Sequence, residues 1–266
     1  MTLLIALDVD GTVMREDGVI TDEVIEAVHR ARDLGHEVML ATGRSVSMTL
    51  PVLDRLRITP AFVVCANGAI TLQRDAAAPT GYTRAFVDTF QPRDVLTTIS
   101  THLSGARYAV EDADGRFRFA GGDFPEAGIE QNGERVTFEE LLEVQATRVV
   151  VISPEHAVED FLRIVERMGL HKVSYNVGWT SWLDIAPDGV NKATALERVR
   201  ELLGTPLSDV VAIGDGRNDV DMLQWASAEG RGIAMGQAPD EVIDAANETT
   251  ASDIANGVAA VLDALK

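Results

Sequence analysis

Short aliphatic runs alternate with amphipathic segments along the first 70 residues of the chain. The runs at 3–7, 38–41 and 62–65 contain no polar position, as is typical of strands covered by helices on both faces. Between the first two runs, apolar residues recur at helical spacing from Thr21, a good N-cap, to Gly35, a good helix stop. This β–α–β–α–β alternation predicts an α/β fold with a Rossmann-like, doubly wound parallel sheet.

The pattern changes at about residue 80 and changes back at about residue 187. Between these points the expected strands are shorter and are interleaved with two or three helices, which predicts a separate α+β unit of roughly 100 residues. We therefore expect a discontinuous core made of 1–80 and 188–266, with a cap domain inserted at 81–187. Expected helices lie at 92–103, 158–168, 192–203, 240–246 and 254–265, a short helix begins after the capping-box residue Thr137, and expected strands lie at 108–111, 117–120, 149–152, 173–177, 182–185, 210–213 and 232–235.

Two local features of the sequence each have two interpretations, and a third leaves a helix boundary undefined. Pro51 leaves the start of the helix after residue 45 undefined, because proline disrupts a helix interior. Asp17-Gly18 predicts either a short hairpin flap or an ordinary turn. The acidic stretch 112–114 is a candidate cation loop, although Asp and Gly in a turn require no ligand.

Composition narrows the possible partners of the protein. The 266 residues carry a formal net charge of −19, which disfavours binding to nucleic acid or to an anionic membrane surface. The start of the chain lacks the basic region of a signal peptide, and no apolar run is long enough to span a membrane. The single cysteine, Cys65, lies in an apolar run and is interpreted as a core residue in a reducing compartment. We expect a cytoplasmic monomer or weak homodimer.

Acidic residues follow two of the expected buried strands. Asp8 and Asp10 come directly after the first strand, two positions apart and beside Gly11, and Asp215 and Asp219 follow the strand at 210–213. The carboxyl ends of parallel strands meet at one edge of a sheet, where ligands bind. Clustered carboxylates need a cation, and Mg²⁺ prefers oxygen ligands of this kind. The sequence therefore predicts a Mg²⁺ site at this edge.

Other polar residues near strand ends are suited to binding a phosphoryl group. A hydroxyl, an ammonium and the backbone amides of glycine-containing turns all hold phosphate oxygens in proteins. Taken singly, Lys192 has the alternative interpretation of a solvated surface residue, Thr42 of a helix cap and Asp219 of a helix N-terminal charge. The candidates are Thr42, Lys192, Gly11, Gly43, Arg44, Asn67 and Asn218.

These motifs together resemble one known family. D-x-D-G-T from Asp8, A-T-G-R from Ala41, N-G from Asn67, D-G-x-N-K from Asp188 and G-D-G-x-N-D from Gly214 look like the motif set of the Cof-type branch of the haloacid dehalogenase superfamily. The resemblance implies a Mg²⁺-dependent phosphatase with a large inserted cap, which acts on small phosphorylated metabolites such as sugar phosphates through an aspartyl phosphate.

The resemblance also implies roles for individual residues. Asp8 would be the nucleophile and Asp10 the general acid/base, while Thr42 and Lys192 would bind phosphate. Asp8, Asp10 and Asp215 would bind the metal, with Asp219 behind them. The chain departs from the family pattern at Gln237, where asparagine is usual, and at 252–257, which lacks the usual acidic residues.

Three alternative functions remain open at this point. A phosphomutase would use the same aspartyl phosphate but return the phosphoryl group to its substrate. A receiver domain is also phosphorylated on aspartate, but it is about half this length and lacks an insertion. A non-catalytic metabolite-binding module would retain the fold without turnover. Candidate specificity residues are Arg44, Asn67, Arg116, Arg118, Trp179 and Trp182, the tryptophans having cap core as the alternative interpretation.

Overall fold

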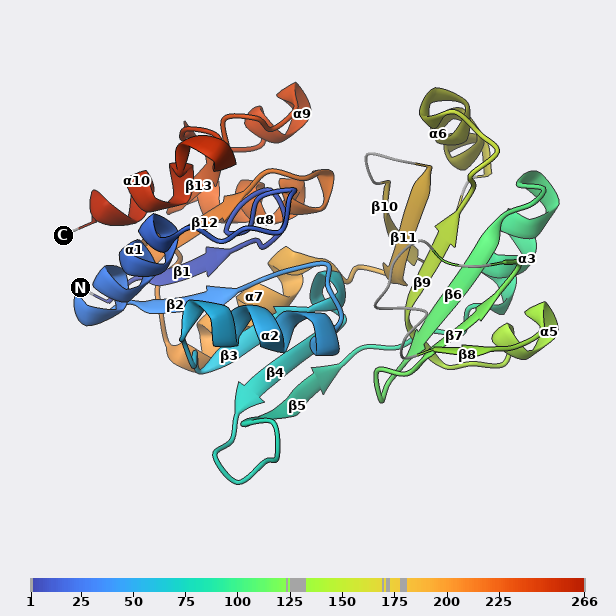
Figure 1. The fold of residues 1–266 in the computed structure, drawn as a ribbon, viewed down its shortest axis with the longest axis horizontal. Coiled ribbons are helices and arrows are strands. Elements are labelled where there is room, and N and C mark those ends of the chain that lie inside the picture. Colours follow the sequence, from blue (N-terminus) through green and yellow to red (C-terminus); the bar gives the residue numbers. More distant parts are fainter. Residues whose placement is uncertain are drawn as a thin grey trace. The chain divides into compact units, whose positions relative to one another are not determined.

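A computed structural model describes residues 2–122, 124, 133–168, 170, 173–177 and 181–265. Contacts within the chain divide it into two compact units, Met1–Phe86 with Asn191–Lys266, and Val87–Val190 (Figure 1). The divisions therefore fall at 86/87 and 190/191, compared with 80/81 and 187/188 in the sequence-based assignment. The second unit therefore separates in sequence two segments that fold together in the first unit.

The first unit is built on a five-stranded sheet in the order β14-β13-β12-β1-β2, in which every pair is parallel. Leu7, the last residue of β1, lies opposite Ile213 of β12 and Leu40 of β2. The carboxyl ends of three strands therefore meet at one edge, as predicted. The strands are β1 (Leu4–Leu7), β2 (Glu37–Leu40), β12 (Val210–Gly214), β13 (Arg231–Ala234) and β14 (Glu248–Thr249).

Helices cover this sheet as the apolar periodicity predicts. Ala195 and Leu196 of α7 and Met222 of α8 pack against Leu4 and Ala6 of β1 in one buried core. The Thr21 side chain caps α1 by accepting a hydrogen bond from the Val24 amide. The helices of this unit are α1 (Asp22–Asp33), α2 (Val46–Leu56), α7 (Lys192–Leu203), α8 (Val220–Ser227), α9 (Asp240–Ile243) and α10 (Gly257–Asp263), with a short 3₁₀ turn at Asp253–Ala255.

The third strand of the expected parallel sheet pairs mainly with an antiparallel neighbour, contrary to the prediction. β3 (Phe62–Cys65) is not a member of the five-stranded sheet, but an isolated parallel bridge joins Val64 to Ala41, the residue after β2. Its main partner is β4 (Ile70–Arg74), which is antiparallel and continues into β5 (Tyr82–Val87), two strands that the sequence analysis missed. A tight connection with positive φ at Asn67 and Gly68 reverses the chain and causes this pairing. Cys65 is buried, as expected.

Several boundaries also differ from the expected ones. α2 begins at Val46 and contains Pro51 in its interior, so proline does not set its start. The expected helices at 240–246 and 254–265 are shorter, and Asn256, with φ of 57°, separates the 3₁₀ turn from α10. Gly18 donates its amide to the Arg15 carbonyl in a turn without flanking strands, which favours the ordinary-turn interpretation.

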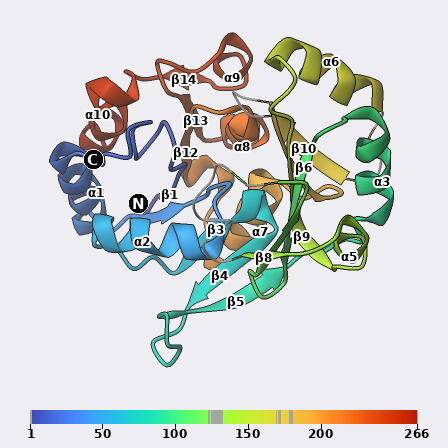
Figure 2. The same cartoon turned by 45° about the vertical axis from the view of Figure 1, so that its right-hand side comes forward.

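The second unit contains a six-stranded sheet in the order β10-β11-β9-β6-β7-β8. Its helices α3 and α6 lie on the same face, where Leu96 and Phe161 join a core with Val149 and Leu183 (Figure 2). The predicted capping box is formed by Thr137 and Glu140. The elements are β6 (Arg107–Asp112), β7 (Phe117–Ala120), β8 (Gly133–Arg135), β9 (Ala146–Ile152), β10 (Val173–Val177), β11 (Trp182–Pro187), α3 (Arg93–His102), α5 (Phe138–Leu141) and α6 (Val158–Met168), of which β8 was not predicted.

One close backbone approach connects the reversal after β3 to the start of α7. Gly68 has φ of +104°, and a Cβ added there would lie 2.2 Å from the Asn191 carbonyl oxygen. Only glycine permits both this conformation and this contact. Because Lys192 follows Asn191, the approach fixes the position of the first residue of α7.

Substituting Gly68 tests this packing. Gly68→Ala is expected to lower the free energy of unfolding by more than the roughly 1–3 kcal/mol typical of backbone strain alone, because the added methyl group also collides with the Asn191 carbonyl. Gly35→Ala is the matched control, since Gly35 has φ of +88° and open space around it. Urea unfolding of both variants measures the difference, and equal losses would contradict the prediction.

Candidate active site

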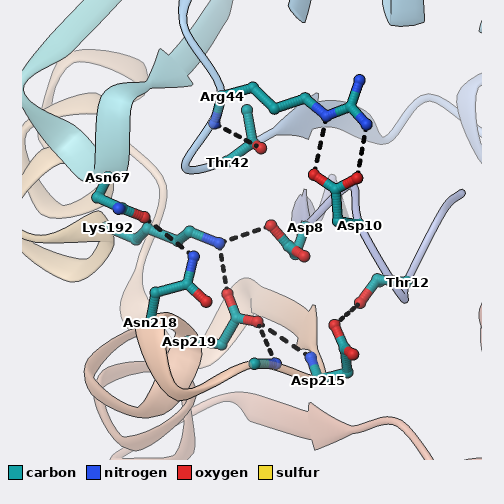
Figure 3. Close-up of polar contacts among 11 residues, drawn as sticks. Asp8, Asp10, Thr12, Thr42, Arg44, Asn67, Lys192, Asp215, Asn218 and Asp219 are labelled. Carbon is teal, nitrogen blue, oxygen red and sulfur yellow. Dashed lines mark hydrogen bonds and ion pairs between the residues drawn. The ribbon is translucent and has the colours of Figure 1, made fainter. Parts of the chain in front are cut away.

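The predicted site residues meet at the carboxyl edge of β1, β2 and β12, within the first unit (Figure 3). Asp8 follows β1 directly, and its amide donates to the Ile213 carbonyl of β12 at 2.9 Å. Gly11 then turns the chain with φ of +71°, and a Cβ there would lie 2.1 Å from Asp215 Oδ2. The loop after β1 therefore lies directly against the loop after β12.

A buried ammonium group joins these two loops. Lys192 Nζ donates to Asp8 Oδ1 and to Asp219 Oδ1, each at 2.6 Å, and its side chain is 0% exposed (Figure 3). Lys192 is the first residue of α7, which Asn191 caps by accepting from the Thr194 amide. A lysine buried this completely has a role in the site and is not a solvated surface residue.

The second oxygen of Asp219 organises the backbone of its own loop. Asp219 Oδ2 accepts from the amides of Asp215 and Gly216 at 3.0 and 2.9 Å. Gly214 makes room for it, since a Cβ at that position would lie 2.4 Å from the Asp219 carboxyl carbon. Both oxygens of Asp219 are thus already engaged, which suits a supporting role behind the other carboxylates.

Asp215 presents its carboxylate beside Asp8. Thr12 Oγ1 donates to Asp215 Oδ1 at 3.2 Å, and Gln237 Nε2 donates to Oδ2 at 3.3 Å. Among the described residues, Asp8, Asp215 and Asp219 form a group in which one carboxylate oxygen from each lies within 4.8 Å of the others. These are hard oxygen donors of the kind that bind divalent cations.

The charge balance of this group fits a cation. Burial, and then the negative charge of Asp219, raises the pKa of Asp8 well above its usual range, although Lys192 opposes the shift. The same two causes raise the pKa of Asp215 to about 7. For Lys192, burial alone would lower the pKa, but attraction by Asp219 and Asp8 outweighs it, so the ammonium stays charged. Three carboxylates against one ammonium leave excess negative charge, which a divalent cation would offset.

Asp10 occupies a different environment from Asp8. Its carboxylate accepts two hydrogen bonds from Arg44, at 2.8 Å from Nε and 2.6 Å from Nη2, and its side chain is 59% exposed (Figure 3). The structure thus brings Asp8 and Asp215 together but holds the Asp10 carboxylate on Arg44. Arg44 was predicted from the sequence to bind the substrate, and its ion pair with Asp10 was not predicted.

The remaining phosphate candidates line one side of the site. The Thr42 hydroxyl accepts from the Arg44 amide at 3.2 Å, and Asn218 Nδ2 donates to Asn67 Oδ1 at 3.0 Å. A Cβ on Gly43 would lie 3.0 Å from Asn67 Oδ1, so glycine there keeps the two loops in close contact. These residues come from the ends of β2, β3 and β12.

Of the specificity candidates in the second unit, Arg118 and Trp182 make contacts within that unit. Arg118 pairs with Asp112 at 3.1 Å, and the Asp112 side chain also accepts from the Asp114 and Arg116 amides, so an ordinary turn accounts for this acidic stretch. Trp182 packs against a small apolar core, in agreement with the cap-core interpretation. Trp179 lies outside the described residues.

Comparison with known proteins gives the family. The model of the haloacid dehalogenase-like hydrolases matches residues 5–262. The chain belongs to this family. The family predicted from the sequence motifs and the predicted class of enzyme, a hydrolase, are thereby confirmed.

Relatives of this hydrolase include named phosphatases. It is 28% identical to the 5-amino-6-(5-phospho-D-ribitylamino)uracil phosphatase YitU of Bacillus subtilis, over 97% of this chain and 96% of the relative. It is 29% identical to the pyridoxal phosphate phosphatase YbhA of Escherichia coli, with the same two coverages. A solved haloacid dehalogenase-like hydrolase from B. subtilis matches it with a TM-score of 0.80 at 22% identity over 100% of both chains, which shows a shared fold.

Two residues of the site were not assigned a role from the sequence. Thr12 belongs to the D-x-D-G-T motif, and its hydroxyl binds Asp215, a contact that the motif order alone does not reveal. Gln237 was noted only as a departure from the family pattern, yet it contacts Asp215 as well.

No helix in the described part of the hydrolase is long and apolar enough to cross a membrane.

The raised pKa of Asp215 predicts a pH dependence of cation binding. A carboxyl with a pKa of about 7 holds its proton below that pH, and a cation must displace this proton in order to bind. Binding of Mn²⁺ or Mg²⁺ is therefore expected to be at least about tenfold weaker at pH 6 than at pH 8, measured by isothermal titration calorimetry. Asp215→Asn removes the titrating group, and its residual binding should vary less with pH. Equal affinity of the unaltered protein at both pH values would contradict this assignment.

Proposed function

We propose that this hydrolase is a Mg²⁺-dependent phosphatase that cleaves small phosphorylated metabolites through an aspartyl phosphate on Asp8. The observation that carries the proposal is the buried contact of the Lys192 ammonium with Asp8 and Asp219, beside Asp215. A carboxylate held next to fixed positive charge at a strand end is suited to in-line attack on phosphorus. Asp8 and Asp215 would hold the metal, which would supply further neutralisation of the phosphoryl oxygens.

In the first step, an Asp8 carboxylate oxygen forms a bond to phosphorus while the bond from phosphorus to the leaving oxygen breaks. Asp10, two residues further along the chain, would give its proton to that leaving oxygen. The Lys192 ammonium would attract the phosphoryl oxygens, and the Thr42 hydroxyl and the amide of Gly43 would donate to them. The product of this step is a neutral alcohol and a phosphorylated Asp8.

In the second step, a water oxygen attacks phosphorus and the bond from phosphorus to the Asp8 oxygen breaks. Asp10 would accept the proton that this water loses, which regenerates the acid for the next cycle. Because Asp10 is paired with Arg44 in the structure, the anionic substrate would compete for this guanidinium and free Asp10 for proton transfer. The reaction thus uses both carboxylates of the first motif, in different roles.

The substrate class follows from the relatives and from the charge of the protein. YitU and YbhA are named for small phosphorylated metabolites, and a net charge of −19 disfavours polyanionic macromolecules. We therefore include sugar phosphates and similar monoesters in the proposal, together with a cytoplasmic location and a monomeric or weakly dimeric state. The second unit would act as the cap that selects the leaving group.

Replacing the nucleophile tests the covalent step. Asp8→Asn is expected to reduce turnover of p-nitrophenyl phosphate with Mg²⁺ by at least about 10³-fold, because an amide is a poor nucleophile at phosphorus. Asp54→Asn, an exposed change on α2, is the control. Near-normal turnover by Asp8→Asn would contradict the proposed intermediate.

In the same assay with a sugar phosphate, stoichiometric release of inorganic phosphate by the unaltered protein separates a phosphatase from a phosphomutase.

Asp10→Asn separates acid/base catalysis from nucleophilic attack. Since one carboxyl group serves both steps, rapid-quench kinetics should show slower phosphorylation of the protein and slower dephosphorylation, each by about 10²- to 10⁴-fold. The comparison uses a natural alkyl phosphate, whose leaving group needs a proton more than p-nitrophenolate does. If neither step slows, the acid/base is a different residue.

A further inference from the structure

Gln237 links three parts of the first unit that are distant in sequence. Its Nε2 donates to the Gly11 carbonyl at 2.5 Å and to Asp215 Oδ2 at 3.3 Å, and its Oε1 accepts from the Asp253 amide at 3.1 Å. The amide thus uses both of its N–H groups and its oxygen. It connects the loop after β1, the loop after β12 and the 3₁₀ turn before α10.

The orientation of this amide is fixed by the chemistry of its partners. The Gly11 carbonyl and the Asp215 carboxylate only accept hydrogen bonds, whereas the Asp253 N–H only donates. Turning the amide over would place its oxygen against two acceptors and its N–H groups against a donor. The side chain therefore has one favourable orientation, which holds Asp215 Oδ2 from one side.

The two oxygens of Asp215 are each held by a neutral donor. Thr12 binds Oδ1 and Gln237 binds Oδ2, while the backbone amide of Asp215 is held by Asp219. Each carboxylate oxygen has further lone pairs, so one hydrogen bond on each orients the group without exhausting its capacity to bind a cation. Hydrogen bonds of this kind to a ligating carboxylate set its direction and strengthen metal binding.

Residues 253–256, which include the hydrogen-bond partner of the Gln237 oxygen, are themselves anchored to the loop after β1. Arg15 donates to the Ile254 carbonyl and to Asn256 Oδ1, both at 3.2 Å, and Thr21 Oγ1 donates to the same Asn256 oxygen at 3.0 Å. Residues 253–256 are therefore tied at one end to Gln237 and at the other to Arg15 and Thr21. The position of the Gln237 oxygen is determined by a segment with contacts at both of its ends.

We propose that Gln237 is a positioning residue, which orients Asp215 for a divalent cation and couples cation binding to the order of residues 253–256. The inference rests on the proposed function only in taking Asp215 as a metal ligand. By thermodynamic reciprocity, a cation that favours one orientation of Asp215 also stabilises the contact between Gln237 and Asp253. Cation binding then reduces the opening of the 253–256 segment.

The test compares Gln237→Met with the unaltered protein. Methionine keeps the length of the side chain but removes all three hydrogen bonds, and Gln224→Met, at an exposed position on α8, is the matched control. We expect Gln237→Met to bind Mn²⁺ about 10- to 100-fold more weakly in calorimetry. At saturating Mg²⁺, its KM for p-nitrophenyl phosphate should change by less than about threefold, because other groups make the contacts with the substrate. Gln237→Ala should behave similarly if the methionine variant fails to fold.

Amide hydrogen exchange gives a readout that does not depend on activity. In the unaltered protein and in Gln224→Met, Mg²⁺ should slow exchange of the Asp253 amide, and in the Gln237 variants this effect should be lost. Mn²⁺ affinity within twofold of the unaltered protein in a folded Gln237 variant, or an Asp253 amide insensitive to Mg²⁺, would overturn the inference alone. An unaltered protein that binds no Mn²⁺ would overturn it together with the metal dependence of the proposed function.

Discussion

The arrangement of this site depends on one buried cation, the ammonium of Lys192. Removing an ammonium and two carboxylates from water costs several kcal/mol for each ion, and only close, well-directed contacts offset that cost. Here the offset comes from contacts of 2.6 Å to Asp8 and Asp219. Asp219 in turn holds the Asp215 amide. Asp8 and Asp219 are therefore directed by the lysine that they share, whereas the Asp215 carboxylate is directed by Thr12 and Gln237.

The remaining excess of negative charge gives this arrangement its chemistry. One ammonium does not balance Asp8, Asp215 and Asp219, and burial together with the negative charge of Asp219 raises the pKa values of Asp8 and Asp215. A site in this condition attracts protons or cations, and a phosphoryl group brings further negative charge that also requires neutralisation. Fold stability and reactivity are thus connected, because the group that makes burial of Asp8 tolerable is also positioned to stabilise charge in the reaction.

Much of the first unit was predictable because its signals are local. Unbroken apolar runs identified β1, β2, β3 and β12, although β4, β5 and β14 were not predicted, and carboxylates directly after β1 and β12 identified the edge where a site forms. The reversal after β3 was less accessible, since it involves the approach of Gly68 to Asn191, which lies far along the chain. The motif order indicated which residues converge. It did not reveal that Arg44 binds Asp10 or that Gln237 contacts Asp215, because such contacts depend on side-chain directions across segments far apart in the chain.

The junction between the two units has a consequence for how such an enzyme diversifies. The chain leaves the first unit at Phe86 and re-enters it at Asn191, immediately before Lys192. An inserted module can therefore change in sequence and size while the chemistry encoded on either side is preserved. The two joints differ: the first lies at the end of β5, whereas the second lies directly before α7, where a single added or deleted residue at 190 would rotate the helix by about 100° and carry the lysine out of register.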